Sequence, residues 1–167
     1  MLPIGDIMRE HRLIEGMITL TVRESAMMKN TNKVDTLLVN FIIGFLRTYA
    51  DQFHHGKEED ILFRDLRKKE LLPEHESILN DLITEHAYAR KIVNGMEYAN
   101  QRYAQGQIAT SRDVMKYLDD LIELYPTHIA KEDKQFFIPF MEYFSKKELD
   151  NMFNEFLEFD KKMANEQ

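Results

Sequence analysis

Two short patterns in this chain place a histidine four residues before a glutamate. His54 and Glu58 form one of them in FHHGKEED, and His128 and Glu132 form the other in HIAKED. On a helix, residues i and i+4 lie on the same face one turn apart, so each imidazole and carboxylate can reach a common metal ion, or the carboxylate can bridge two ions. Imidazole and carboxylate donors without sulfur suit iron, manganese or zinc. The two patterns therefore predict a site for two metal ions.

Two more histidines, His11 and His86, lie on the apolar stripes of other predicted helices. A buried histidine needs a partner, and a helical core offers few. A single histidine on an apolar face is usually an ordinary core residue, but one on each of four converging helices indicates a shared ligand. The metal ligands predicted on these four helices are His11, His54, Glu58, His86, His128 and Glu132.

His55 is open to two interpretations. The stripe through Glu58 and Leu62 projects back to a point between His54 and His55, so either ring can face inward. His55 is therefore either a further metal ligand or a hydrogen-bond donor on the solvent side. The sixth histidine, His75, lies in the connection LLPEHES and is expected at the surface.

Tyrosines near the predicted ligands are candidates for the surroundings of the site. They are Tyr49, Tyr88 and Tyr125, and Tyr125 stands one turn before His128, where it could orient a ligand. The ten methionines are expected to fill gaps in the core rather than to bind metal.

Long amphipathic helices must position these residues. Apolar residues recur every three or four positions in segments 4–29, 32–71, 79–105 and 110–139, on stripes that include Val22 in the first segment and Phe41 in the second. LLPEH at 71–75 is a predicted helix stop, and Ser145 with Glu148 forms a capping-box pattern before a fifth segment whose stripe runs from Leu149 to Leu157.

The fold class predicted from these segments is all-α, an up-down-up-down four-helix bundle with an additional C-terminal helix. We expect a single domain over residues 1–167, with the core bundle at about 2–143 and the extra helix at about 146–164. The extra helix either covers one side of the bundle or offers its apolar face to a partner protein or a second copy. Ferritin-like bundles are disfavoured because they use Glu-x-x-His motifs, and no histidine here has a glutamate three residues before it.

Composition excludes several function classes. The net charge is −7, with 29 acidic and 22 basic residues and no dense basic cluster, so nucleic acid is not an expected partner. There is no cysteine, which excludes disulfides, thiolate metal sites and cysteine nucleophiles. The N-terminus lacks the features of a signal peptide and no apolar run reaches 18 residues, so we expect a cytoplasmic protein that does not enter a membrane.

The order H…HxxxEE…H…HxxxE resembles the hemerythrin-like, or HHE cation-binding, domain. The resemblance covers roughly Leu2 to Met141, and its most specific stretches are FHHGKEEDILF and HIAKEDKQFFIP. It implies a left-handed four-helix bundle around a non-haem di-iron centre with an oxo or hydroxo bridge, although manganese or zinc could replace iron. By motif, Glu58 and Glu132 would bridge the two ions, and the histidines would fill the outer positions.

The sequence departs from the oxygen-carrying members in its third helix, and in its fourth it carries their HxxxxD pattern beside HxxxE. Where these resemble HxxxH, the residue four after His86 is Arg90, so a second histidine of the third helix is missing and His55 could replace it. Asp133 lies five residues after His128, which leaves Glu132 or Asp133 as the second bridge; the projected stripe favours Glu132.

The resemblance implies a protein that binds dioxygen or nitric oxide as a small gas ligand, or that senses or stores iron, without catalysis. An alternative is a di-iron enzyme of oxidative or nitrosative stress, such as an oxidase, a peroxide- or nitric-oxide-detoxifying enzyme or an iron–sulfur cluster repair protein. Repair is weakened because the repair proteins resemble a longer architecture with a cysteine-bearing module. A third interpretation is an interaction module whose last helix docks a partner while the metal stabilises the fold.

Overall fold

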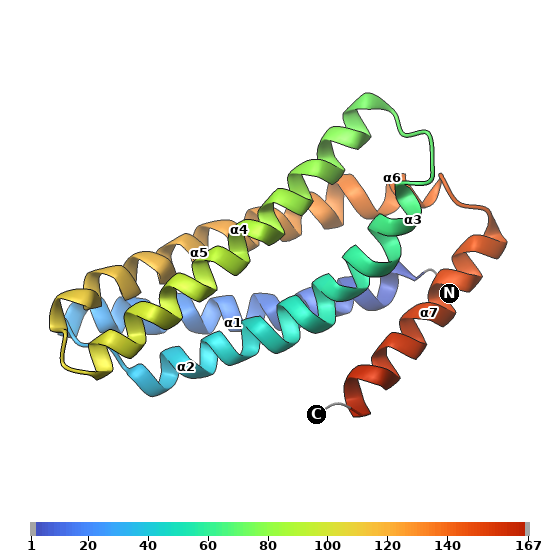
Figure 1. The fold of residues 1–167 in the computed structure, drawn as a ribbon. Helices are drawn as coiled ribbons and strands as arrows, with labels where there is room; N and C mark the ends of the chain where they lie inside the picture. The colour runs from blue at the N-terminus through green and yellow to red at the C-terminus, as the bar shows by residue number, and fades with distance from the viewer. Residues whose placement is uncertain (1–2, 166–167) are drawn as a thin grey trace.

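The computed structural model describes residues 3–165, and these form helices and short connections with no strand among them. The prediction of an all-helical bundle is confirmed; residue 2, the predicted start of its core, lies outside the described residues. Four long helical stretches lie side by side, and α7 (Lys146–Asn165) lies against one end of them (Figure 1).

Two of the four stretches are single α-helices, α1 (Ile4–Thr31) and α4 (Pro73–Ala104). The other two are continuous but change pitch. The first runs through α2 (Thr36–Phe45), the π-helical segments η1 (Leu46–His55) and η2 (Glu58–Phe63), and α3 (Arg64–Leu66). The second follows the short 3-10 turn η3 (Ile108–Thr110) and runs through α5 (Ser111–Lys131), the π-helical segment η4 (Glu132–Phe136) and α6 (Phe137–Met141).

Helix α4 packs against α5 and α2, and α1 packs against α5 and η1, so each stretch has two neighbours. Connections 32–35 and 105–110 lie at one end of the molecule, and connection 67–72 lies at the opposite end (Figure 1). Side chains from all four stretches therefore meet along one central axis.

Local sequence explains where the helices begin and end. Helix α1 ends at Thr31, and the left-handed backbone of the cap residue Asn32 (φ 53°) lets the N–H of Lys33 donate to the Met28 carbonyl over 3.2 Å. The Asp35 side chain accepts a hydrogen bond from the Leu38 N–H and caps α2. The predicted helix stop at LLPEH was wrong in position, because the second stretch already ends at Leu66. Pro73 of this segment instead occupies the first turn of α4, where proline is favoured.

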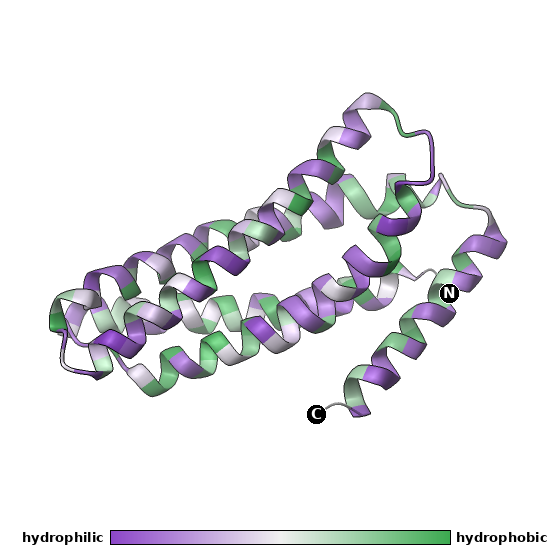
Figure 2. Ribbon diagram, in the orientation of Figure 1, coloured by the Kyte–Doolittle hydropathy of each residue, from purple (hydrophilic) through white to green (hydrophobic). Residues whose placement is uncertain are grey.

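The capping box before the last helix is confirmed. The Ser145 N–H donates to the Glu148 carboxylate over 2.8 Å, and the Glu148 N–H donates to the Ser145 hydroxyl over 3.3 Å. Met152 and Phe156 are buried, so α7 covers one side of the bundle, whereas Leu157 of the predicted stripe is 38% exposed. Figure 2 shows hydrophilic and hydrophobic residues alternating along α7, as an amphipathic helix requires.

Two hydrophobic clusters make up the core, one on each side of the site described below. The stripes predicted for the third and fourth segments are buried, but Val22 is 47% and Phe41 58% exposed, so these two predictions were wrong. In α1 the buried stripe continues through Thr21 and Ser25, polar residues that a search for apolar positions passes over. Around Phe41 most residues are apolar, so periodicity does not identify the inward face.

Candidate metal centre

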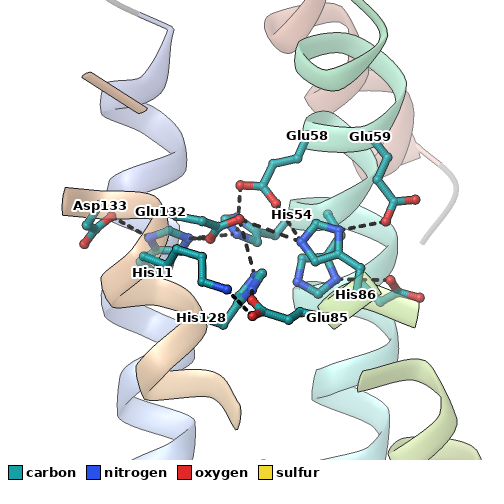
Figure 3. Close-up of polar contacts among 12 residues, drawn as sticks. His11, His54, Glu58, Glu59, Glu85, His86, His128, Glu132 and Asp133 are labelled. Atoms are coloured by element: carbon teal, nitrogen blue, oxygen red, sulfur yellow. Dashed lines mark hydrogen bonds and ion pairs between the residues drawn. The ribbon is translucent and has the colours of Figure 1, made fainter. Parts of the chain in front are cut away.

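All seven residues singled out as ligands lie in the middle of the bundle, and none is more than 4% exposed. Each of the four helical stretches contributes at least one, as Figure 3 shows for the labelled side chains. They are His11 of α1, His54 and His55 of η1, Glu58 of η2, His86 of α4, His128 of α5 and Glu132 of η4.

The π-helical segments explain how neighbouring residues can share one site. In an α-helix, 3.6 residues complete a turn, so adjacent side chains diverge strongly. The second stretch is π-helical up to His55 and again from Glu58, and both His54 and His55 are 1% exposed. Glu132 begins the π-helical segment of the fourth stretch. Such segments are rare and are frequent at functional sites.

The seven residues form two adjoining groups. One group contains His11, His54, Glu58 and Glu132, and the other contains His55, His86 and His128; in each, one donor atom per residue lies within 4.8 Å of the others. We call them the two-histidine half and the three-histidine half. Each is a set of donor atoms close enough together to hold a metal ion.

Both glutamates reach across the two halves. Glu58 places one oxygen 3.7 Å from Nε2 of His54 and the other 3.5 Å from Nε2 of His86. Glu132 places one oxygen 3.0 Å from Nε2 of His11 and the other 3.4 Å from Nε2 of His128. Two carboxylates that each turn one oxygen to either half are arranged as bridging ligands would be.

A carboxylate holds the outer nitrogen of every histidine in the centre. Each Nδ1 lies 2.7–3.2 Å from a carboxylate oxygen, in the pairs His11–Asp133, His54–Glu10, His55–Asp51, His86–Glu59 and His128–Glu85. When Nδ1 carries the proton and donates it to the carboxylate, Nε2 keeps a free lone pair directed toward the centre. This carboxylate–histidine arrangement is the usual support of metal-binding imidazoles.

These pairs also separate Glu132 from Asp133. Glu132 lies fully buried between the two halves, whereas Asp133 contacts the outer nitrogen of His11 over 2.8 Å and is bound by Arg12. Of the two candidates, it is therefore Glu132, the residue favoured from the sequence, whose carboxylate lies between the two halves, whereas Asp133 supports a histidine.

The inward-facing atoms fit a cation. Nε2 of His11 lies 3.1 Å from Nε2 of His54 and 3.0 Å from an oxygen of Glu132, so three polar atoms from three helical stretches converge on one point. Nε2 of His55, His86 and His128 and both oxygens of Glu58 and Glu132 have no hydrogen-bond partner. A buried polar group without a partner costs about 1–3 kcal/mol, so a cation that accepts these lone pairs would stabilise the set.

The electrostatics of the site point the same way. Burial and the neighbouring carboxylate of Glu132 raise the pKa of Glu58 well above its usual range. Two such carboxylates can both be charged in a dry core only when a cation lies near them. Burial, followed by the nearby His86 ring, lowers the pKa of His55 to about 3, which keeps that imidazole neutral, the form that binds metal.

An outer ring of cations surrounds the supporting carboxylates. Asp133 is bound by Arg12, Glu10 by Lys57, Glu85 by Lys131, and Asp51 and Glu59 are both bound by Arg90. Burial raises the pKa of Asp51, but hydrogen bonds from His55 and Arg90 outweigh it and bring the pKa to about 2. The carboxylates that support the histidines are therefore themselves fixed by arginine and lysine side chains.

Sequence reasoning assigned a supporting role to none of these carboxylates, although a signal for four of them exists. Glu10, Glu59, Glu85 and Asp133 each stand beside a predicted ligand in the sequence, yet each supports a histidine of a different helix. A carboxylate that is adjacent in sequence to a ligand candidate lies at the same level along the bundle axis as the metal centre. Which helix supplies the histidine that such a carboxylate contacts depends on how the helices pack.

The three tyrosines differ in position. Tyr125 is buried and borders a cavity of about 180 Å³ that also touches His55, Ala89 and Arg90. Tyr49 is half-buried and stacks between Phe45 and Phe53, and Tyr88 is 44% exposed on the outside of α4, so the latter does not line the site.

His75 lies away from the centre, as predicted, but it is half-buried rather than at the surface. Its Nδ1 lies 2.7 Å from the Tyr143 hydroxyl, and its ring packs on Phe140. Helix α6 and the connection after it therefore cover this histidine.

The comparisons with known proteins agree with this geometry. The model of the hemerythrin HHE cation-binding domain matches residues 2–138, which include every ligand candidate. No curated protein and no solved structure matched the chain. With most of its length matched by that family model and its buried histidines and glutamates gathered in two groups that could hold a metal ion, the chain belongs to the hemerythrin HHE cation-binding domain family.

Proposed function

We propose that this protein is an up-down-up-down four-helix bundle that holds two iron ions and reversibly binds dioxygen or nitric oxide at one of them. The observation that carries the proposal is the set of inward side chains: five imidazoles and two carboxylates, all buried, with Nδ1 of every imidazole held by another carboxylate. Imidazole and carboxylate donors suit iron, and bound iron would supply the affinity for the gas.

The two halves differ in the number of donors they offer. With Glu58 and Glu132 shared, the three-histidine half offers three imidazoles and two oxygens, and the two-histidine half offers two imidazoles and two oxygens. The two-histidine half therefore leaves more room for an external ligand. We propose that the gas binds there.

The walls of the centre favour a small neutral ligand. Phe137 stacks on His11 at 5.6 Å between ring centroids, and Phe63 stacks on His86 at 5.6 Å. The two hydrophobic clusters close the bundle on either side. Entering such a site costs a charged solute its hydration, whereas dioxygen and nitric oxide lose little.

Metal analysis of protein purified without air tests the proposal, together with an absorption spectrum recorded on exposure to air. We expect two iron ions per chain and a charge-transfer spectrum that appears with dioxygen or nitric oxide and disappears when the gas is removed. A chain that binds no transition metal after reconstitution with iron, manganese or zinc would contradict the proposal. Sustained consumption of dioxygen, peroxide or nitric oxide with a reductant would indicate an enzyme instead.

A further inference from the structure

Arg90 contacts two of the carboxylates that support the centre. Its Nε donates to Asp51 over 2.8 Å, and its terminal nitrogen donates to Glu59 over 2.7 Å. Asp51 holds Nδ1 of His55, and Glu59 holds Nδ1 of His86. One guanidinium is thus linked to two rings of the three-histidine half that come from different helical stretches.

The two rings that are linked to Arg90 through Asp51 and Glu59 are also in contact with each other. His55 and His86 stack with their centroids 3.7 Å apart and their planes 14° from parallel. Parallel rings this close have their orientations coupled, so a change in the carboxylate behind one ring affects the other. The remaining ring, His128, is held separately by Glu85, which Lys131 binds.

We infer that Arg90 is a positioning residue that fixes His55 and His86 together, through Asp51 and Glu59, and so builds the three-histidine half of the centre. This inference rests on the proposed function. Arg90 stands one turn after His86 on α4, where a histidine of α4 could have reached the centre directly. Here α4 supplies Arg90, which holds the supporting carboxylates, and the adjacent helical stretch supplies the ring of His55.

Guanidinium geometry explains why the position needs arginine. Arginine presents donors in a fixed planar fork, so it can hold two carboxylates at once, whereas lysine is a single flexible point charge. Asp51 and Glu59 belong to η1 and η2, and α4 packs against η1. A single arginine therefore fixes the register between α4 and the π-helical stretch at the height of the metal.

The test compares Arg90→Ala and Arg90→Lys with the wild-type protein and with Arg47→Ala. Arg47 borders the same cavity but binds Glu97 and Asn94, so its variant is the matched control. Each protein is loaded with cobalt(II) or iron(II) and titrated with a chelator, and bound metal per chain is measured. The unfolding midpoint of the metal-free protein is recorded alongside.

We expect Arg90→Ala to weaken the binding of one of two ions by roughly ten-fold or more, the usual effect of losing a group that supports a ligand. Arg90→Lys should recover part of this loss, and Arg47→Ala should bind both ions as the wild type does. In a His55→Ala background, Arg90→Ala should cause no further loss of metal, whereas in a His11→Ala background its effect should persist.

Three results separate the possibilities. Wild-type protein that binds no metal would refute the proposed function and this inference with it. Two ions bound with unchanged affinity in Arg90→Ala would refute the inference alone. Equal weakening of both ions, together with a lower unfolding midpoint of the metal-free protein, would show that Arg90 stabilises the bundle in general and would also refute it.

Discussion

The two halves of the centre offer similar donors but have different surroundings. Behind the two-histidine half, Glu10 is bound by Lys57, a lysine that is fully buried, lies 4.0 Å from the Phe53 ring and pairs with Asp160 of α7 at 2.9 Å. The three-histidine half borders a cavity of about 180 Å³ at His55 and is held by the half-exposed Arg90. The half at which we propose that the gas binds is thus the one whose supporting Glu10 is linked to α7 through Lys57.

This difference shows that the number of donors in a half and the surroundings of that half depend on separate parts of the fold. Donor number depends on which residues of the four long stretches face inward. The surroundings include α7 at one half and the packing of η1 against α4 at the other. At Gly56 a side chain would lie 2.8 Å from the Phe159 ring, so the absence of a side chain there lets α7 approach the bundle closely.

The largest effect is expected from the glutamates that the halves share. Glu132→Ala or Glu58→Ala should reduce bound metal from two ions to none, because each removes a ligand of both positions. Ligand binding at a thousand times its dissociation constant stabilises a protein by about 4 kcal/mol, and that stabilisation should disappear. Metal analysis and thermal unfolding with and without metal measure it.

Single-half variants provide the control for that result. His54→Ala and His55→Ala should each retain one ion, because each histidine belongs to a different half. Unchanged metal content in both glutamate variants, or complete loss in both histidine variants, would contradict the division into two halves.

The next largest effect is expected at Lys57. Lys57→Met would leave Glu10 without its buried cation, and breaking a buried ion pair costs about 3–5 kcal/mol. Because Glu10 also holds His54, the ion of the two-histidine half should dissociate faster than the other. Chemical denaturation and stopped-flow transfer of metal to a chelator measure these two effects.

Lys68→Met is the matched control, because it removes a lysine from an ion pair at the surface. Lys68 pairs with Asp65, and the Lys68 side chain is 65% exposed. Exposed pairs contribute about 0–1 kcal/mol, so stability and metal release should stay close to those of the wild type. Equal metal release from both halves in Lys57→Met would argue against a role of α7 that is specific to one half.

A third prediction concerns protons. Burial lowers the pKa of His11, but hydrogen bonds to Asp133 and Glu132 outweigh it and raise the pKa to about 9. His11 of the metal-free protein is therefore protonated at pH 7.5 and must lose that proton to bind metal. We expect protons to be released when metal is added in weak buffer with an indicator dye, and about one fewer per chain in His11→Ala.

The sign of the accompanying stability change is fixed by the same shift. A histidine whose pKa is raised on folding stabilises the folded state below its unfolded pKa of about 6.5, and this contribution is lost as the pH rises through 9. The metal-free protein should therefore become less stable between pH 6.5 and 9.5. A stability that rises over this range would contradict the assignment.

The smallest effect is expected at the cavity beside His55. Ala89→Leu would fill part of it at a cost of about 1–3 kcal/mol for overpacking, without removing a ligand. Metal content should stay at two ions. If gas reaches the centre past α7, its association rate measured by flash photolysis should not change; a slower rate would place the route at the three-histidine half.

The sequence by itself determined the helical stretches, the family and the residues that meet in the core. This was possible because the i, i+4 spacing of His54 with Glu58 and of His128 with Glu132 is a local property of a helix. The burial of the third and fourth stripes followed from periodicity in the same way. These features depend on residues that are close together along the chain.

Tertiary structure decided the rest. The inward position of both His54 and His55 depends on π-helical turns, which the 3.6-residue period does not reveal. The carboxylate behind each of His11, His54, His86 and His128 comes from another helical stretch, so its choice depends on how the stretches pack. Spacing along one helix identifies the donors, but only the contact between helices shows what holds each donor in place.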